Sequence, residues 1–144
     1  MDVIQEMPHC FVMQSLKDDR GAIARPLLSI VDDDESVRES LPDLITELGF
    51  AARAFSSAEE FLSSGSIDET SGLILDVSMP GMSGPELYQE LKRRGRKIPV
   101  IFITAQRDET IRARAFEQGA AGFLLKPFSD EALLAAIKTA LKVT

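Results

Sequence analysis

The sequence predicts an α/β fold in which a doubly wound parallel sheet of five strands is covered by five helices. From Leu27 onward, short apolar segments alternate with segments whose apolar residues recur at helical spacing. Capping residues, glycines and prolines separate these segments. Strict alternation of strand and helix is typical of right-handed βαβ crossovers, which place helices on both faces of a parallel sheet.

The five strands are predicted from short, nearly continuous apolar runs, which are typical of strands buried on both faces. They cover residues 27–31, 50–55, 72–76, 98–103 and 122–125. Pro99 lies near the start of the fourth strand, a position where the missing backbone donor is tolerated. Residues 65–72, before the third strand, are predicted to form a polar loop.

The first helix follows from Val37, Leu41, Leu44 and Leu48, which share one helical face, and it is predicted to end at Gly49. Pro42 lies inside this helix and removes one backbone donor. We therefore expect a kink or an irregular turn there.

Capping residues predict where the other four helices begin. Capping boxes, Ser57-Ala58-Glu59-Glu60 and Ser83-Gly84-Pro85-Glu86, open the second and third helices, and the third runs to about Arg94. Asp108 caps a fourth helix that Gly119 ends. Ser129 caps a fifth, with Leu133, Ile137 and Leu141 on one face.

The turn after the first strand decides between the two common strand orders of such sheets. The dinucleotide-binding order normally carries a glycine-rich turn at this point. Here the turn is Asp32-Asp33-Asp34-Glu35, which would repel a pyrophosphate. The sequence therefore predicts the flavodoxin-like order 2-1-3-4-5 for a domain that covers residues 27–144.

Residues 1–26 lie outside this pattern. We expect a short helix followed by a linker, with a disordered tail as the alternative.

Charge and composition exclude several function classes. The net charge is −7, and residues 92–97 form the one notable basic run, so direct nucleic-acid binding by this chain is not expected. No apolar run approaches the roughly 18 residues of a membrane span. The single Cys10 has no partner for an internal disulfide, and the N-terminus lacks a basic signal-peptide region. A cytoplasmic location is expected.

Acidic residues follow two strands that are neighbours in the predicted order. Asp32 and Asp33 come after the first strand, and Asp76 ends the third, so these side chains are expected to face one another. Three close carboxylates repel each other, and a Mg²⁺ ion, which prefers oxygen ligands, would relieve that repulsion. The alternative is that an acid merely caps the first helix, a role we expect for Asp34 or Glu35.

Two further polar side chains end the fourth and fifth strands. The Thr104 hydroxyl could donate a hydrogen bond to a phosphoryl oxygen, although a lone threonine here is more often a strand-end cap. Lys126 precedes Pro127 at the end of a buried strand. Its ammonium could neutralise charge on a transferring phosphoryl group.

The chain resembles the receiver domain of two-component response regulators over roughly residues 27–143. The matching segments occur in the family's order and spacing. They are Ile30-Val31-Asp32-Asp33-Asp34-Glu35, Leu75-Asp76, Met79-Pro80-Gly81-Met82-Ser83-Gly84, Ile103-Thr104-Ala105, and Gly119-Ala120 leading to Leu125-Lys126-Pro127-Phe128.

The resemblance implies that Asp76 is the phosphoacceptor. Asp33, Asp76 and the backbone carbonyl of Ser78 would ligate Mg²⁺, with Mn²⁺ as an alternative ion and Asp32 helping directly or through water. Thr104 and Lys126 would contact the phosphoryl oxygens.

The resemblance also implies how the domain switches. The Lys126–Pro127 peptide bond would be cis. Phe123 would be the aromatic switch residue that responds to movement of Thr104, and Ser78 and Gln106 would influence the rate of dephosphorylation.

The function expected from the resemblance is that of a phosphorelay switch, not an enzyme beyond its own phosphorylation and dephosphorylation. A histidine kinase or phosphotransfer protein would donate the phosphoryl group. The face formed by the fourth helix, fifth strand and fifth helix would then control a partner protein or a fused output domain. Homodimerisation on phosphorylation is a further expectation.

We weigh two alternative functions, and two forms of the receiver itself. An aspartyl phosphatase would need a second acid two residues after the nucleophile, where this chain has Ser78. A pseudo-receiver would have lost one of the acidic, Thr104 or Lys126 positions. We favour a stand-alone receiver because the chain begins with Met1 and ends where the fifth helix should finish. The alternative is that the chain is the receiver of a DNA-binding regulator. Residues 119–123 are similar to the same segment in receivers that are attached to helix-turn-helix domains.

Overall fold

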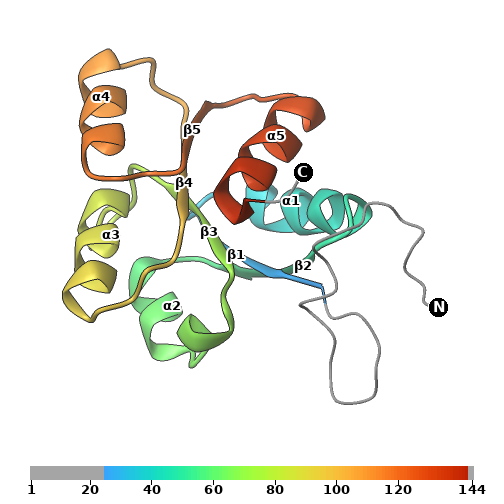
Figure 1. Cartoon of the computed structure of the whole chain (residues 1–144), viewed down its shortest axis with the longest axis horizontal. Coiled ribbons are helices and arrows are strands. Elements are labelled where there is room, and N and C mark those ends of the chain that lie inside the picture. The colour runs from blue at the N-terminus through green and yellow to red at the C-terminus, as the bar shows by residue number, and fades with distance from the viewer. Residues whose placement is uncertain (1–24, 143–144) are drawn as a thin grey trace.

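A computed structural model describes residues 25–142, and its centre is a five-stranded parallel sheet (Figure 1). The strands are β1 (Leu27–Val31), β2 (Ala51–Phe55), β3 (Gly72–Asp76), β4 (Val100–Thr104) and β5 (Gly122–Leu125). Their order is β2-β1-β3-β4-β5, with every pairing parallel. The predicted fold class and strand order are confirmed. The segment predicted over residues 1–26 as a short helix and linker, or as a tail, lies outside the described residues up to residue 24.

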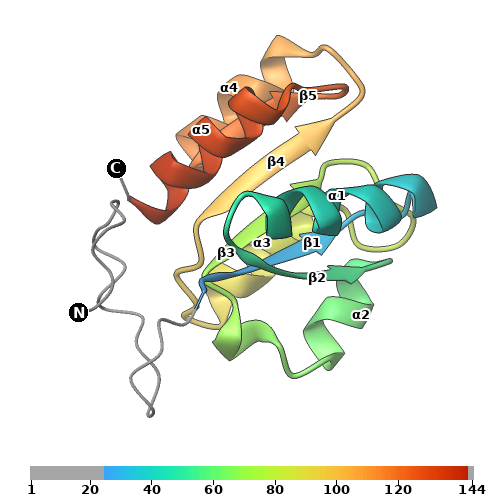
Figure 2. The ribbon, with the colours of Figure 1, turned by 90° about the vertical axis from the view of Figure 1, so that its right-hand side faces the viewer.

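Helices cover both faces of the sheet. They are α1 (Glu35–Glu47), α2 (Ala58–Ser63), α3 (Gly84–Arg93), α4 (Glu109–Glu117) and α5 (Asp130–Leu141). Figure 2 looks onto the face that carries α1 and α5, whereas α2, α3 and α4 cover the opposite face (Figure 1). Within residues 25–142, no helix combines the length and the apolar character needed to cross a bilayer.

Alternate strand residues divide the core between these two faces. In β3, Ile74 packs in the cluster with Leu41 and Ile45 of α1 and with Leu133 and Ile137 of α5. Its neighbours in the strand belong to the opposite cluster, which contains residues of α2, α3 and α4. Both faces of the central strands are therefore buried, which explains their continuous apolar sequence.

The predicted caps begin the helices as expected. The side chains of Asp34, Ser57, Ser83, Asp108 and Ser129 each accept a hydrogen bond from a backbone N–H in the first turn of the helix that follows. Each cap satisfies a donor that has no partner within the helix.

Only one of the two hydrogen bonds of the capping box predicted at Ser57 is present. Ser57 accepts from the Glu60 N–H at 3.0 Å. The Glu60 carboxylate, however, accepts from the N–H of Ser56 at 2.6 Å and from its hydroxyl at 2.8 Å. Two donors on Ser56 hold Glu60 better than the single N–H of Ser57, so the reciprocal bond is displaced by one residue.

Other boundaries differ slightly from prediction. Strand β4 begins at Val100 because Pro99 has no N–H to donate, and only the Pro99 carbonyl pairs, accepting from Leu73 N at 2.9 Å. Phe50 lies before β2, since its N–H bonds to Ile45 O at the end of α1. The loop at 65–72 contains a 3₁₀ turn, η2 (Ile67–Glu69). Helix α1 runs through Pro42 without interruption, so the irregular turn is not observed.

The first residue of α3 packs directly against the end of β3. The Gly84 N–H donates to Val77 O at 3.0 Å. A Cβ at position 84 would lie only 2.2 Å from the Asp76 carbonyl oxygen, which is a backbone atom and cannot rotate away. Glycine is therefore the one residue that lets α3 start this close to Asp76.

We predict that Gly84→Ala lowers the free energy of unfolding by about 1–3 kcal/mol, because overpacking against backbone forces α3 away from β3. Urea denaturation measures this loss. Gly122→Ala is the control, since its Cβ would meet side chains at 3.4–3.5 Å, an ordinary contact distance. Equal losses in the two variants would contradict the steric explanation.

Candidate functional site

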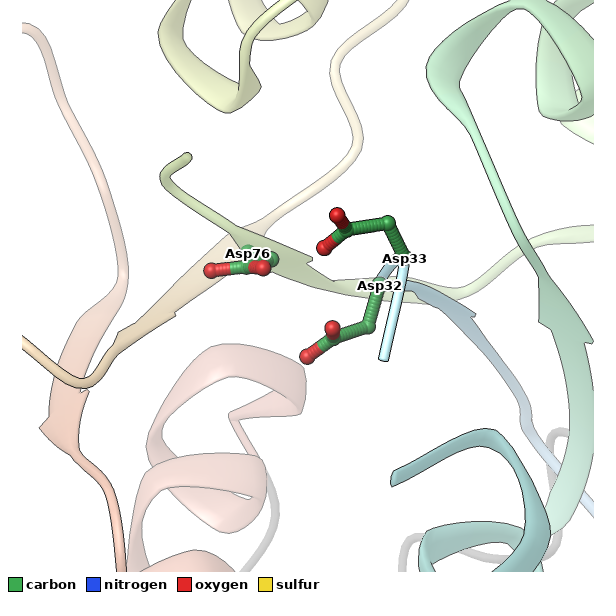
Figure 3. Close-up of side chains that lie close together, drawn as sticks. All are labelled: Asp32, Asp33 and Asp76. Atoms are coloured by element: carbon green, nitrogen blue, oxygen red, sulfur yellow. The ribbon is translucent and has the colours of Figure 1, made fainter. Parts of the chain in front are cut away.

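Three carboxylates meet at the carboxyl ends of β1 and β3 (Figure 3). Asp32 and Asp33 follow β1, Asp76 ends β3, and one oxygen from each lies within 4.8 Å of the others. Asp32 and Asp76 are buried, whereas Asp33 is exposed. The predicted convergence of these acids is confirmed.

Strand pairing is the reason that these acids meet. Val31 of β1 lies opposite Leu75 of β3, so the next residue on each strand carries a carboxylate. The Asp32 N–H extends the β2 pairing by donating to Phe55 O at 3.1 Å. The Val77 N–H does the same toward β4, donating to Ile103 O at 3.0 Å.

The N-cap of α1 is Asp34, so neither Asp32 nor Asp33 is needed to cap this helix. The Asp34 carboxylate accepts from the N–H and the hydroxyl of Ser36 at 2.9 and 2.8 Å. These bonds hold the pKa of Asp34 below its ordinary value. The cap of α1 is therefore Asp34, one of the two residues expected in that role, and the cap does not involve the Asp32 or Asp33 side chain.

Lys126 reaches the acids from the end of β5. Its Nζ lies 2.8 Å from Asp32 Oδ2 and 3.8 Å from Asp76 Oδ2. Its backbone N–H donates to Thr104 O at 2.7 Å, which ties the residue to β4. The Lys126–Pro127 bond is cis, as expected.

The site carries excess negative charge. Burial, and secondly the charge of Asp32, raises the pKa of Asp76 to about 7, while Lys126 and a hydrogen bond from the Ser78 N–H oppose the rise. Three carboxylates against one ammonium leave two negative charges when all are ionised. This pocket favours a cation.

The arrangement fits a hard divalent ion. Mg²⁺ binds oxygen ligands at about 2.0–2.1 Å in octahedral geometry, so two ligands of one ion lie about 3–4 Å apart. The three carboxylate oxygens lie within 4.8 Å of one another, so small side-chain rotations would bring them around one ion. Mn²⁺ takes the same kind of oxygen ligands. Ser78 lies two residues after Asp76, in the loop that follows β3.

Thr104 and Gln106 form one local unit at the end of β4. Thr104 is almost fully buried, and its Oγ1 accepts from the Gln106 N–H at 3.1 Å. Because the oxygen is already an acceptor, the hydroxyl hydrogen remains free to donate. Asp76 pairs with Ile103, so Thr104 lies one residue beyond that pair.

Phe123 lies apart from the carboxylates, in β5 opposite Phe102. It is half-buried and lines a cavity of about 170 Å³ together with Val77, Ile111 and Ala115. Val77 follows Asp76, so the cavity links the phenyl ring to the acidic site through one intervening residue.

Two contacts near the site were not anticipated from the sequence. The Arg38 guanidinium of α1 donates to Asp32 O at 3.1 Å. The Glu59 carboxylate of α2 accepts from the Met82 N–H at 3.0 Å. Both join residues on different elements, and neither residue type nor spacing distinguishes these side chains from ordinary surface charges.

We predict that metal-free Asp76→Asn is more stable than wild type at pH 8, by about 1–3 kcal/mol. The raised pKa means that the native state holds this proton more tightly than the unfolded state, so wild type loses stability as pH rises from about 4 to about 7. Denaturant unfolding with a chelator present, at pH 4 and pH 8, measures the difference. A gap that is largest at pH 4 would contradict this assignment.

Comparison with known proteins agrees with this geometry. Residues 28–138 match the family described as response regulator receiver domain. The response regulator protein TodT of Pseudomonas putida is 42% identical over 117 residues, which cover 81% of this chain and 52% of that protein. The chain spans about half the length of the curated relatives it matches.

Solved structures show the same similarity. The response regulator StyR superposes with a TM-score of 0.76 at 44% identity, covering 83% of this chain and 60% of that one. FixJ-N superposes with a TM-score of 0.73 at 38% identity, covering 81% and 94%. The acidic pocket, the strand order and these matches together show that the chain belongs to the receiver domain family of two-component response regulators.

Proposed function

We propose that this receiver domain is a phosphoacceptor switch whose acceptor is Asp76. The observation that carries the proposal is the position of the Asp76 carboxylate, buried beside two other acids and 3.8 Å from the Lys126 ammonium. The phosphoryl donor would be a histidine kinase or a phosphotransfer protein. The domain would catalyse its own phosphorylation and dephosphorylation and no other reaction.

The chemistry is nucleophilic attack by a carboxylate. An ionised Asp76 oxygen attacks phosphorus of a phosphohistidine and forms the new P–O bond. The P–N bond breaks, and the imidazole nitrogen keeps the bonding pair and takes up a proton. Lys126 offsets charge on the phosphoryl oxygens, and the free hydroxyl hydrogen of Thr104 donates to one of them.

The acids beside Asp76 would hold the metal. Asp33, Asp76 and the Ser78 carbonyl would ligate Mg²⁺ or Mn²⁺, with Asp32 acting directly or through water. Bound there, the ion would neutralise phosphoryl charge and orient the donor for in-line transfer. Asp32 is also bonded to Lys126, so it positions that ammonium as well.

The switch would pass from Thr104 to Phe123. A shift of Thr104 toward the phosphoryl group would leave space, and the Phe123 ring, beside the cavity under α4, would rotate inward. The face of α4, β5 and α5 would change as a result. Ser78 and Gln106, next to the acceptor and to Thr104, would set the rate at which water removes the phosphate.

The output would be a partner protein or a fused output domain, and phosphorylation could also promote homodimerisation. The relatives are about twice as long as the matched segment, which supports the receiver of a DNA-binding regulator, and the stand-alone receiver stays a prediction. A phosphorylation-independent pseudo-receiver is less well supported, because the acidic, threonine and lysine positions are all present. The cytoplasmic location stays a prediction.

Replacing the acceptor tests the proposal directly. Wild type incubated with Mg²⁺ and acetyl phosphate should gain one phosphoryl group, seen as a mass increase of the intact protein, and Asp76→Asn should gain none because the amide is not nucleophilic. Beryllofluoride should shift amide resonances in wild type alone. Equal labelling of the variant would place the acceptor elsewhere.

Lys126→Ala separates metal binding from phosphoryl transfer. The variant should bind Mg²⁺ at least as tightly as wild type, since a cation beside the site has been removed. Its phosphorylation rate should fall about 10²–10³-fold, because charge on the phosphoryl group is no longer offset. Loss of Mg²⁺ binding, measured by calorimetry, would show that Lys126 instead holds the acids in place.

A further inference from the structure

The loop between β3 and α3 is held by backbone bonds at its two ends. The Val77 N–H donates to Ile103 O, and the Gly84 N–H returns to Val77 O, each at 3.0 Å. Ser78 and its neighbours lie between these points. The middle of the loop is also bonded to helix α2. There, Oε2 of Glu59 accepts a hydrogen bond from the Met82 N–H at 3.0 Å.

The carboxylate of Glu59 also lies close against the turn of the loop. Gly81 has φ +76°, and a Cβ there would come within 2.9 Å of Glu59 Oε2. The loop therefore turns through a left-handed glycine at the point where the carboxylate contacts it. A larger residue at position 81 would displace Glu59.

Helix α2 gives Glu59 a firm base. Ala58 and Phe61, on either side of Glu59, are fully buried in the core. The Ser57 cap fixes the first turn by accepting from Glu60 N at 3.0 Å. Packing in the core thus fixes the backbone of Glu59. Its side chain in turn holds the loop by accepting the hydrogen bond from Met82.

We propose that Glu59 is a positioning residue of the metal and phosphoryl site. By holding Met82, it fixes the path of the loop that carries Ser78, whose backbone carbonyl would be a ligand of the cation. This role rests on the proposed function in so far as Ser78 is assigned as a metal ligand. Groups that orient metal ligands commonly affect affinity without touching the ion.

Three variants test this role. Glu59→Ala removes the acceptor, and Glu59→Gln keeps a carbonyl acceptor while removing the charge. Glu60→Ala is the matched control, because Glu60 is the next residue of α2 and also accepts from a backbone N–H, that of Ser56, away from the loop. Mg²⁺ dissociation constants are measured by calorimetry without any phosphoryl donor. Hydrogen exchange of the Met82 and Ser78 amides is followed with a chelator present.

We expect Glu59→Ala to weaken Mg²⁺ binding about 3- to 10-fold and to speed exchange at Met82 and Ser78. Glu59→Gln should stay within about twofold of wild type in affinity. Glu60→Ala should also stay within about twofold, even though it loosens the start of α2.

Each opposite result would overturn the role. If Glu59→Ala bound Mg²⁺ as tightly as wild type, Glu59 would not be a positioning residue. Equal weakening in Glu59→Gln would assign the effect to charge acting through space, and equal weakening in Glu60→Ala would assign it to general loosening of α2. A wild-type protein that binds no Mg²⁺ would overturn the metal assignment itself, and the two amide exchange rates would still report whether Glu59 holds the loop.

Discussion

The parallel pairing of β1 with β3 is the constraint on which the rest of the site depends. It places Val31 opposite Leu75, so that the chain positions immediately after this pair bring Asp32 against Asp76. The pairing is held by burial of both sheet faces, because β1 and β3 are covered by helices on either side. Hydrophobic burial therefore forces two carboxylates together that would separate in water, and the raised pKa of Asp76 reflects the cost.

Residues from neighbouring elements offset the charge of these carboxylates and hold the backbone beside them. Lys126 comes from β5 and lies nearer to Asp32 than to Asp76, so it offsets charge without neutralising the acceptor. Gly84 allows α3 to begin against the Asp76 carbonyl, and Glu59 holds the intervening loop from α2. Residues from β5 and from two helices on one face of the sheet thus converge on one strand end, which is where ligands bind in open α/β sheets.

Local signals in the sequence were sufficient where the interaction itself is local. Asp34, Ser83 and Asp108 cap their helices as predicted, because a cap needs only the first turn that follows it. Two local predictions were wrong in detail. Glu60 accepts hydrogen bonds from Ser56 instead of completing the capping box with Ser57, and β4 begins after Pro99, which has no N–H to donate. The contacts of Arg38 and Glu59 could not be anticipated, since each depends on how separate elements pack.

The sequence by itself determined the alternation of strands and helices, the strand order, and the set of acidic, hydroxyl and ammonium groups at the strand ends. These follow from hydrophobic periodicity, from caps and from the acidic turn at residues 32–35, all of which are short-range properties of the chain. Only the tertiary structure decided which groups touch. It placed Lys126 2.8 Å from Asp32 and 3.8 Å from Asp76, and it brought Glu59 to the loop. Those distances arise from packing across the sheet, where residues far apart in the chain are positioned by the core and not by their neighbours in sequence.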